Sequence, residues 1–183
     1  MTDEQLITRI ADTAIKHGTF TLRSGRTSHY YVDKYLFETQ PDIIAALGER
    51  FAVRVAQING GIDRLAGPEL GGVPLVTAAS MATNLPCVFV RNARKEYGTV
   101  KQIEGVLELG DRVVIIEDIA TSGGQSIEAA NALKAAGASV EAIIVVIEFE
   151  GITEAVAVGV GRVGIRVGVV GFLTVGQAVV VLV

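Results

Sequence analysis

The chain has 183 residues, of which 50% are hydrophobic, and its formal net charge is -4. This length is sufficient for one α/β domain with a complete hydrophobic core. The acidic balance argues against a general nucleic-acid binder, because affinity for a phosphate backbone needs an excess of Lys and Arg. The single cysteine, Cys87, excludes an internal disulfide and a cysteine metal cluster.

The N-terminal stretch "MTDEQLITRI" is acidic and amphipathic, and it lacks the basic start and apolar run of a signal peptide. We therefore expect a cytoplasmic protein. Thr2 or Asp3 can cap a first helix, and the spacing of the apolar residues extends this helix to about Lys16.

Residues 20–34, "FTLRSGRTSHYYVDK", predict two short strands on either side of a Ser-Gly-Arg turn. Pro41 is expected near the start of a second helix, which runs to about Ile58. The first helix and these two strands are expected to form an appendage to a main sheet that begins later in the chain.

From Arg64 onward, predicted strands alternate with predicted helices. The strands are nearly continuous aliphatic runs, which is typical of a parallel sheet covered by helices on both faces. The pattern contains no linker, repeat or second core. The first part, "RLAGPELGGVPLVTAASMA", is expected to form a strand, a glycine-rich loop and a helix, and "PCVFVR" is expected to form the next strand. A polar loop, "NARKEYGTVKQIEG", leads to a strand in "RVVIIE". A helix in "SIEAANALKAAG" then ends with a cap at Gly137, and a strand follows in "SVEAIIVVIE".

The C-terminal residues 167–183, "VGVVGFLTVGQAVVVLV", carry no charge and are just long enough to suggest a transmembrane segment. Three glycines, a Thr and a Gln interrupt the run, and valine dominates it. This composition favours a buried strand followed by a short terminal segment.

Two adjacent carboxylates, Glu117 and Asp118, follow an aliphatic strand and precede a Thr-Ser-Gly-Gly turn that opens a helix. Ligands of open parallel sheets bind beyond the carboxyl ends of the strands. The N–H groups of residues 120–125 and the positive end of the helix can together bind an anion.

Because carboxylates repel phosphate, we expect this pair to bind hydroxyls or a metal while the turn binds a phosphate, as a sugar phosphate requires. Neither a P-loop motif nor a dinucleotide fingerprint is present. The alternative is an ordinary strand, turn and helix with acidic residues at a solvated edge.

The stretch "VVIIEDIATSGG" resembles the phosphoribosyl-diphosphate (PRPP) signature of the type I phosphoribosyltransferases. The resemblance implies a Rossmann-like α/β core, with a central parallel sheet flanked by helices, and a small N-terminal hood. It also implies Mg²⁺-PRPP as the phosphoribosyl donor, the acidic pair on the ribose hydroxyls and the turn on the 5′-phosphate. On this basis the residues expected to bind PRPP in the signature are Glu117, Asp118, Ile119, Ala120, Thr121, Ser122, Gly123, Gly124 and Gln125.

Residues 91–105, "RNARKEYGTVKQIEG", carry four cations against two anions on an otherwise acidic chain. If PRPP is the donor, these cations can stabilise the charge that develops on the leaving pyrophosphate. A loop that closes over the site would also exclude water from an oxocarbenium-like transition state. A solvated surface loop is the alternative interpretation of the same charges.

This loop, together with "FTLRSGRTSHYY" and "GPELGGVPL", resembles the orotate phosphoribosyltransferase family, and the last stretch resembles its pyrophosphate-contacting loop. The resemblance implies transfer of phosphoribosyl from PRPP to orotate, giving orotidine 5′-phosphate and pyrophosphate in pyrimidine (UMP) biosynthesis. It further implies a homodimer in which the loop acts as a lid in the neighbouring subunit's site. No membrane or nucleic-acid partner is expected.

The resemblance also assigns roles to individual residues. Glu117, Asp118 and Lys95 are expected to be catalytic, and Arg91, Lys95 and Tyr97 fall on PRPP-binding positions of the lid. The resemblance implies that PRPP supplies most of the ligands of Mg²⁺. It assigns no definite protein ligand, and Asp118 is the nearest candidate. The residues expected to bind the second substrate are Thr121, Arg23 and Phe149.

Four positions depart from the family pattern. Asn92 replaces a second lid Lys, Tyr97 replaces a common His, and Arg23 replaces a Lys. Phe149 stands where the family has an Arg that pairs with the carboxylate of orotate, so that a charged partner is lost. A purine phosphoribosyltransferase is therefore one alternative, because Phe149 could stack on a neutral base. A non-catalytic PRPP-binding regulator is the other.

We expect residues 1–183 to form one phosphoribosyltransferase domain. Residues 1–40 are expected to form mainly the hood, 41–150 the core, and 151–183 a divergent C-terminal part that is rich in Gly and Val.

Overall fold

The computed structural model describes residues 1–21, 25, 27–92, 101–120, 123–149, 166–167, 172–175 and 178–181; from residue 148 onward only the backbone is described. The N-terminal third contains three helices and a hairpin. They are α1 (Asp3–Ala14), β1 (Ile15–Thr21), β2 (Thr27–Val32), α2 (Lys34–Glu38) and α3 (Pro41–Ala56).

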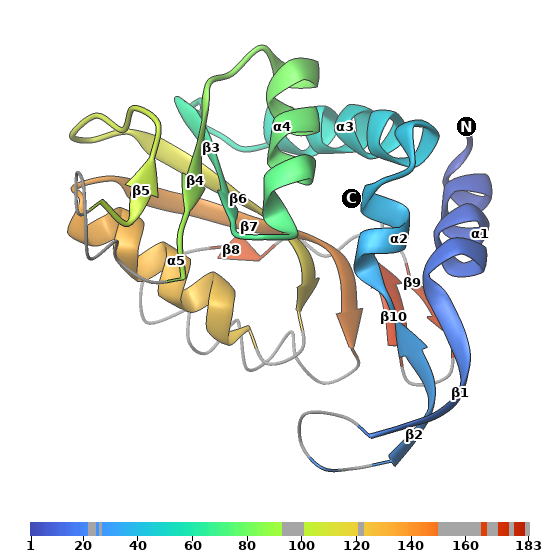
Figure 1. Ribbon diagram of the computed structural model, residues 1–183. Coiled ribbons are helices and arrows are strands. Elements are labelled where there is room, and N and C mark those ends of the chain that lie inside the picture. The colour runs from blue at the N-terminus through green and yellow to red at the C-terminus, as the bar shows by residue number, and fades with distance from the viewer. Residues whose placement is uncertain are drawn as a thin grey trace.

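The remaining elements build the main sheet and two helices that flank it (Figure 1). They are β3 (Arg64–Pro68), α4 (Gly72–Thr83), β4 (Cys87–Val90), β5 (Ile103–Glu104), β6 (Arg112–Ala120), α5 (Gly124–Ala135), β7 (Ser139–Phe149), β8 (Arg166–Val167), β9 (Phe172–Val175) and β10 (Ala178–Val181).

The centre of the main sheet is parallel, as the aliphatic strands predict. The strand order is β5-β4-β3-β6-β7-β10-β9, and β8 also pairs with β7. Strands β4, β3, β6 and β7 are parallel to one another. The antiparallel strands β5 and β10 extend the sheet on its two sides. The carboxyl ends of β3, β6 and β7 therefore lie at one edge of the sheet.

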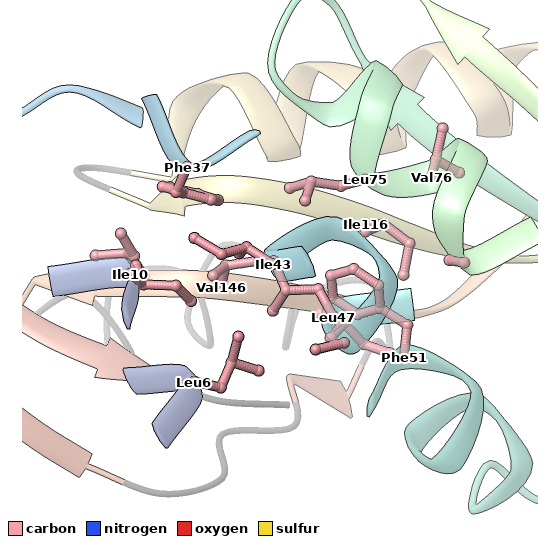
Figure 2. Close-up of a cluster of buried hydrophobic side chains, with 14 of the residues drawn as sticks. Leu6, Ile10, Phe37, Ile43, Leu47, Phe51, Leu75, Val76, Ile116 and Val146 are labelled. Carbon is pink, nitrogen blue, oxygen red and sulfur yellow. The ribbon is translucent and has the colours of Figure 1, made fainter. Parts of the chain in front are cut away.

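The two faces of the sheet bury alternate residues of the same strands. On β6, Val114 and Ile116 belong to the core cluster that includes residues of α1, α3 and α4, whereas Val113 and Ile115 belong to the cluster that includes residues of α5. Figure 2 shows the first cluster, which includes Phe51 of α3 and Ile116 of β6. The core is thus two-sided, with the sheet between two layers of helices.

Helix α1 is a part of the main body rather than of the hairpin. Its residues Leu6, Ile10 and Ala14 are buried in the same cluster as α3. The β1–β2 hairpin, by contrast, forms a separate two-stranded sheet and projects away from the main sheet (Figure 1). The expected division into hood, core and C-terminal part stays a prediction.

Most of the predicted elements are confirmed, with shifted ends. Thr2 and Gln5 form a capping box at the start of α1. The helix ends at Ala14 rather than near Lys16, because Ile15 already pairs with Val32 in the hairpin. Gly137 has a φ of +94°, as expected of a residue that ends a helix.

The helix α2 is absent from the sequence prediction. It has five residues, Lys34 to Glu38, which is too few to produce a hydrophobic period. Helix α3 begins at Pro41 as predicted and ends at Ala56, two residues before the expected end.

The uncharged C-terminal stretch contains the short strands β9 and β10, where one strand and a terminal segment were expected. Within the part of the chain that the structure describes, no helix is both long enough and apolar enough to cross a membrane. The expected cytoplasmic location stays a prediction.

Candidate active site

The acidic pair lies at the carboxyl end of β6, and the alternation of the strand sends its two side chains to opposite faces. Glu117 follows Val113 and Ile115 on the face covered by α5. Asp118 follows Val114 and Ile116 on the face covered by α1, α3 and α4. Both residues are buried, with 3% and 1% of their surface exposed.

Glu117 is held by α5. Its Oε2 accepts a hydrogen bond from Ser126 Oγ at 3.1 Å, and its Oε1 accepts one from the backbone N–H of Asp118 at 3.2 Å. Burial raises the pKa of Glu117 to about 8, and the charge of Asp118 adds to this effect. At neutral pH this side chain therefore carries a proton for most of the time.

Asp118 is paired with a lysine from α2. Lys34 Nζ donates to Asp118 Oδ2 at 2.5 Å, and the backbone N–H of Ile119 donates to Oδ1. Burial alone lowers the pKa of Lys34, but the hydrogen bond to Asp118 and the charge of that carboxylate together outweigh it and raise the pKa. Lys34 is therefore charged, and the pair is a true ion pair.

A third acidic side chain, Glu38, completes the cluster. It is buried, and its Oε1 has no hydrogen-bond partner among the described residues. Burial raises the pKa of Glu38 to about 8; the charge of Asp118 raises it further, and that of Lys34 opposes the rise. The carboxyl groups of Asp118 and Glu38 thus lie near one ammonium group on this face of β6.

The glycine-rich loop between β3 and α4 passes close to Asp118. A Cβ atom on Gly71 would lie 1.4 Å from Asp118 Oδ2 and 3.0 Å from Glu38 Oε1. Gly71 has ordinary helical dihedral angles, φ -67° and ψ -33°. The glycine is therefore required here by the close approach of the loop to the carboxylate, not by an unusual backbone conformation.

The start of the basic loop is tied to the other segments of the site. The backbone N–H of Asn92 donates to Glu69 Oε1 at 2.9 Å, and Arg91 lies 3.8 Å from Glu69 Oε2. Gln125 Nε2 donates to Asn92 Oδ1 at 3.3 Å. The β3–α4 loop, the first residues of the basic loop and the start of α5 therefore meet at one edge of the sheet.

The start of α5, from Gly123 onward, offers N–H groups that can bind an anion. Gly123 has a φ of +70° and caps the helix, which begins at Gly124. N–H groups in the first turn of a helix have no acceptor within the helix and carry a partial positive charge. They lie on the Glu117 side of β6, since Ser126 of this turn contacts Glu117.

The predicted site residues that can be placed lie around this edge. They are Arg91, Glu117, Asp118, Ile119, Ala120, Gly123, Gly124 and Gln125. Phe149 is the last residue of β7 and only its backbone is described. The other predicted residues lie outside the described part of the chain: Arg23, Lys95, Tyr97, Thr121 and Ser122.

Three side chains of the site were missed by reasoning from the sequence: Lys34, Glu38 and Ser126. Lys34 and Glu38 are spaced i, i+4, in "KYLFE", so that they lie on one side of a helical turn. This spacing is a signal that could have indicated them. Ser126 could have been found because it opens the helix that follows the acidic pair.

The site is therefore bipolar. Acidic groups and one lysine lie on the α2 side of β6, and a helix N-terminus lies on the α5 side. Such an arrangement suits a ligand with hydroxyl groups next to a phosphate. The described residues contain no group of three or more His, Cys, Asp or Glu side chains arranged to hold a metal ion.

Residues 37–157 match the family model described as "Phosphoribosyl transferase domain". The fold agrees with this match. The crystal structure of Mycobacterium tuberculosis orotate phosphoribosyltransferase in complex with Fe(III) dicitrate is 27% identical and has a TM-score of 0.77, covering 89% of this chain and 91% of that one. The fold and the site thus define a phosphoribosyltransferase.

Curated relatives narrow the class. The orotate phosphoribosyltransferase of Natronomonas pharaonis is 48% identical over 151 residues, which are 82% of this chain and 84% of the relative. That of Halobacterium salinarum is 45% identical over 149 residues, or 81% and 83% of the two chains. The chain belongs to the orotate phosphoribosyltransferase family. These relatives support the orotate assignment over the purine enzyme and over the regulator.

Proposed function

We propose that the protein transfers the phosphoribosyl group of PRPP to orotate, giving orotidine 5′-phosphate and pyrophosphate in pyrimidine biosynthesis. The observation that carries this proposal is the bipolar edge of the sheet. Asp118 lies near the end of β6 beside the β3–α4 loop, and α5 begins six residues later, on the other face of the same strand.

The donor fits this edge in one orientation. The 5′-phosphate binds the turn at residues 121–125 and the first N–H groups of α5, where a helix N-terminus favours an anion. The ribose hydroxyls donate to the acidic pair, chiefly to Asp118, because Glu117 is protonated and already accepts from Ser126. The pyrophosphate group then extends toward the β3–α4 loop.

In the reaction, a bond forms from N1 of orotate to C1 of the ribose while the C1–O bond to pyrophosphate breaks. The bonding electrons leave with the pyrophosphate, and the N1 proton passes to solvent. No protein nucleophile is needed. The developing positive charge on the ribose is stabilised by Asp118, and the negative charge of the leaving group by Arg91 and Lys95.

The residues present fit a magnesium ion that is held mainly by the donor. Mg²⁺ commonly binds through one or two carboxylates together with substrate phosphates. Asp118 is the carboxylate best placed to contribute, and the described residues offer no all-protein cage. When bound, the ion would neutralise charge on the pyrophosphate group.

The lid beyond Arg91, with Lys95 and Tyr97, is proposed to act in the site of a second copy of the chain. Light scattering should therefore give a dimer mass. Lys95→Gln and Asp118→Asn should each be strongly impaired alone, and mixing them should restore part of the activity, since one site of each mixed dimer then has an intact Asp118 and an intact Lys95. Failure to recover activity in dimers that exchange subunits contradicts a lid that acts between subunits.

The main test is pyrophosphate release from PRPP and Mg²⁺ with orotate, uracil, adenine, guanine or hypoxanthine supplied separately. We expect release with orotate only. Release with a purine would leave the assignment of PRPP as the donor intact but would contradict the assignment of orotate as the acceptor. Binding of PRPP without release for any base would overturn catalysis by this chain.

A further inference from the structure

Lys34 has no role in the function proposed above, yet its side chain forms an ion pair with Asp118 of the acidic pair. Its Nζ lies 2.5 Å from Asp118 Oδ2, although the two residues are 84 positions apart in the chain. Its side chain is 24% exposed, whereas that of Asp118 is 2% exposed. Lys34 therefore approaches Asp118 from the solvent side of the site.

The hydrogen bonds of Asp118 leave little room for a second ligand. Oδ1 accepts from the backbone N–H of Ile119, and Oδ2 accepts from Lys34. The backbone contact is local and can persist when a ligand binds. For a ribose hydroxyl to donate to Oδ2, Lys34 must give up or share that oxygen, and its ammonium group must then find another anion, since a half-buried charge without a partner is costly.

The geometry also indicates where this anion lies. Gly71, of the β3–α4 loop, approaches the same oxygen, Asp118 Oδ2, and also Glu38 Oε1. Lys34 thus faces the loop that resembles a pyrophosphate-contacting loop. The N-terminus of α5, which is proposed to help hold the 5′-phosphate, lies on the opposite face of β6, where Ser126 contacts Glu117.

The balance of charges at this edge is an independent reason to expect that Lys34 binds the donor. Glu38, Glu117 and Asp118 are all buried at this edge, and Lys34 is the cation that contacts Asp118 in the described part of the chain. A donor with several negative charges must bind beside these carboxyl groups. A lysine on a flexible four-carbon stem, with three donor hydrogens, can turn from one oxygen to another within a few ångströms.

We propose that Lys34 is a further substrate-binding residue, which neutralises Asp118 before the donor binds and turns to a pyrophosphate oxygen of PRPP when the ribose hydroxyls occupy Asp118. The inference rests on the proposed function only for the identity of the donor. In this proposal Lys34 exchanges one partner for another: its ammonium group first binds the carboxylate of Asp118 and then binds the leaving group.

The test compares PRPP with ribose 5-phosphate, which has the same hydroxyls and 5′-phosphate but no pyrophosphate. Calorimetric titration with Mg²⁺ is carried out on the wild type, Lys34→Gln and Lys134→Gln. The control removes the same charge near the other end of α5 from the site. We expect Lys34→Gln to weaken PRPP binding roughly tenfold or more while ribose 5-phosphate binds as well as before or better. Lys134→Gln should leave both affinities unchanged, and Lys34→Arg should recover part of the PRPP affinity.

Two results would overturn the proposal. If Lys34→Gln leaves PRPP affinity unchanged, Lys34 does not contact the donor. If the substitution weakens the binding of PRPP and of ribose 5-phosphate equally, Lys34 only positions Asp118. The experiment uses no base, so an error in the assignment of orotate leaves its outcome intact, whereas a wild-type protein that binds no PRPP would refute the proposed function itself.

A second measurement needs no variant and stands if Lys34→Gln does not fold. The rate at which an amine-reactive reagent modifies Lys34 in the wild type can be followed by peptide mass spectrometry. Ribose 5-phosphate should raise this rate, because it displaces Lys34 from Asp118, and PRPP should lower it. An increase with both ligands, or no change with either, contradicts the exchange.

Discussion

Glu117 and Asp118 are adjacent in the chain, but their carboxyl groups contact different layers of the molecule: Glu117 accepts from Ser126 of α5, and Asp118 accepts from Lys34 of α2. The alternation of side chains along β6 causes this separation. The two carboxyl groups therefore differ in charge as well as in position. Glu117, with a pKa near 8, is mostly protonated at neutral pH, and Asp118 is one half of an ion pair.

This difference predicts unequal effects of two isosteric substitutions. Asp118→Asn should lower turnover at least about tenfold, since a hydrogen bond to a charged acceptor contributes about 1.5–3 kcal/mol. Glu117→Gln should cause a much smaller loss, because Gln resembles the protonated acid. Steady-state kinetics with PRPP and orotate measures both. Equal losses, with unchanged circular dichroism, would show that the two carboxyls share one role.

Gly71→Ala should disable the site while the fold survives. The added Cβ would overlap Asp118 Oδ2, so that the carboxylate or the loop must move. We expect PRPP affinity to fall about tenfold or more, which is the effect of losing one charge-assisted hydrogen bond. Calorimetric titration measures the affinity, and thermal unfolding checks the fold. A fully active Gly71→Ala protein would mean that the loop lies further from Asp118 than the structure indicates.

The buried carboxyls predict a stability that falls as pH rises. Glu38 and Glu117 have folded-state pKa values of about 8, above the ordinary 4.5. Between these values the folded protein binds more protons than the unfolded chain, so the free energy of unfolding decreases with pH. The slope is at most about 1.4 kcal/mol per pH unit for each such carboxyl.

Urea unfolding at several pH values between 4.5 and 8 measures this slope. Glu38→Gln should flatten it, because the amide cannot lose a proton. Glu128→Gln is the matched control, since Glu128 is an exposed carboxyl on α5. The explanation fails if Glu38→Gln leaves the pH dependence unchanged.

Phe149→Arg should tighten orotate binding if the acceptor carboxylate lies at the end of β7. The backbone of this strand end lies beside β6, where Glu148 pairs with Ala120. A new charge-assisted hydrogen bond contributes about 1.5–3 kcal/mol, or roughly tenfold and more in affinity. Uracil, which has no carboxylate, is the control ligand, and its affinity should not increase. If orotate binds no better, its carboxylate is held elsewhere.

The order of elements could be predicted from the sequence because its signals are local. Aliphatic runs indicated the parallel strands β3, β4, β6 and β7, and Gly137 indicated the end of α5. The acidic pair followed by a glycine turn indicated a site for a sugar phosphate. The opposite directions of Glu117 and Asp118 also follow from the period of a strand, once the strand is known to continue through them.

The partners of those carboxyls could not be predicted in this way. The contact of Lys34 with Asp118 spans 84 residues, and α2, which carries Lys34, is too short to leave a period in the sequence. The glycine-rich loop could be recognised in the sequence, but the close approach of Gly71 to Asp118 could not. By itself the sequence determined the strands, the turns and the chemistry of the motif, since these depend on neighbouring residues. Only the tertiary structure decided which charges meet, because packing of α2, the β3–α4 loop and β6 brings distant parts of the chain into one buried place.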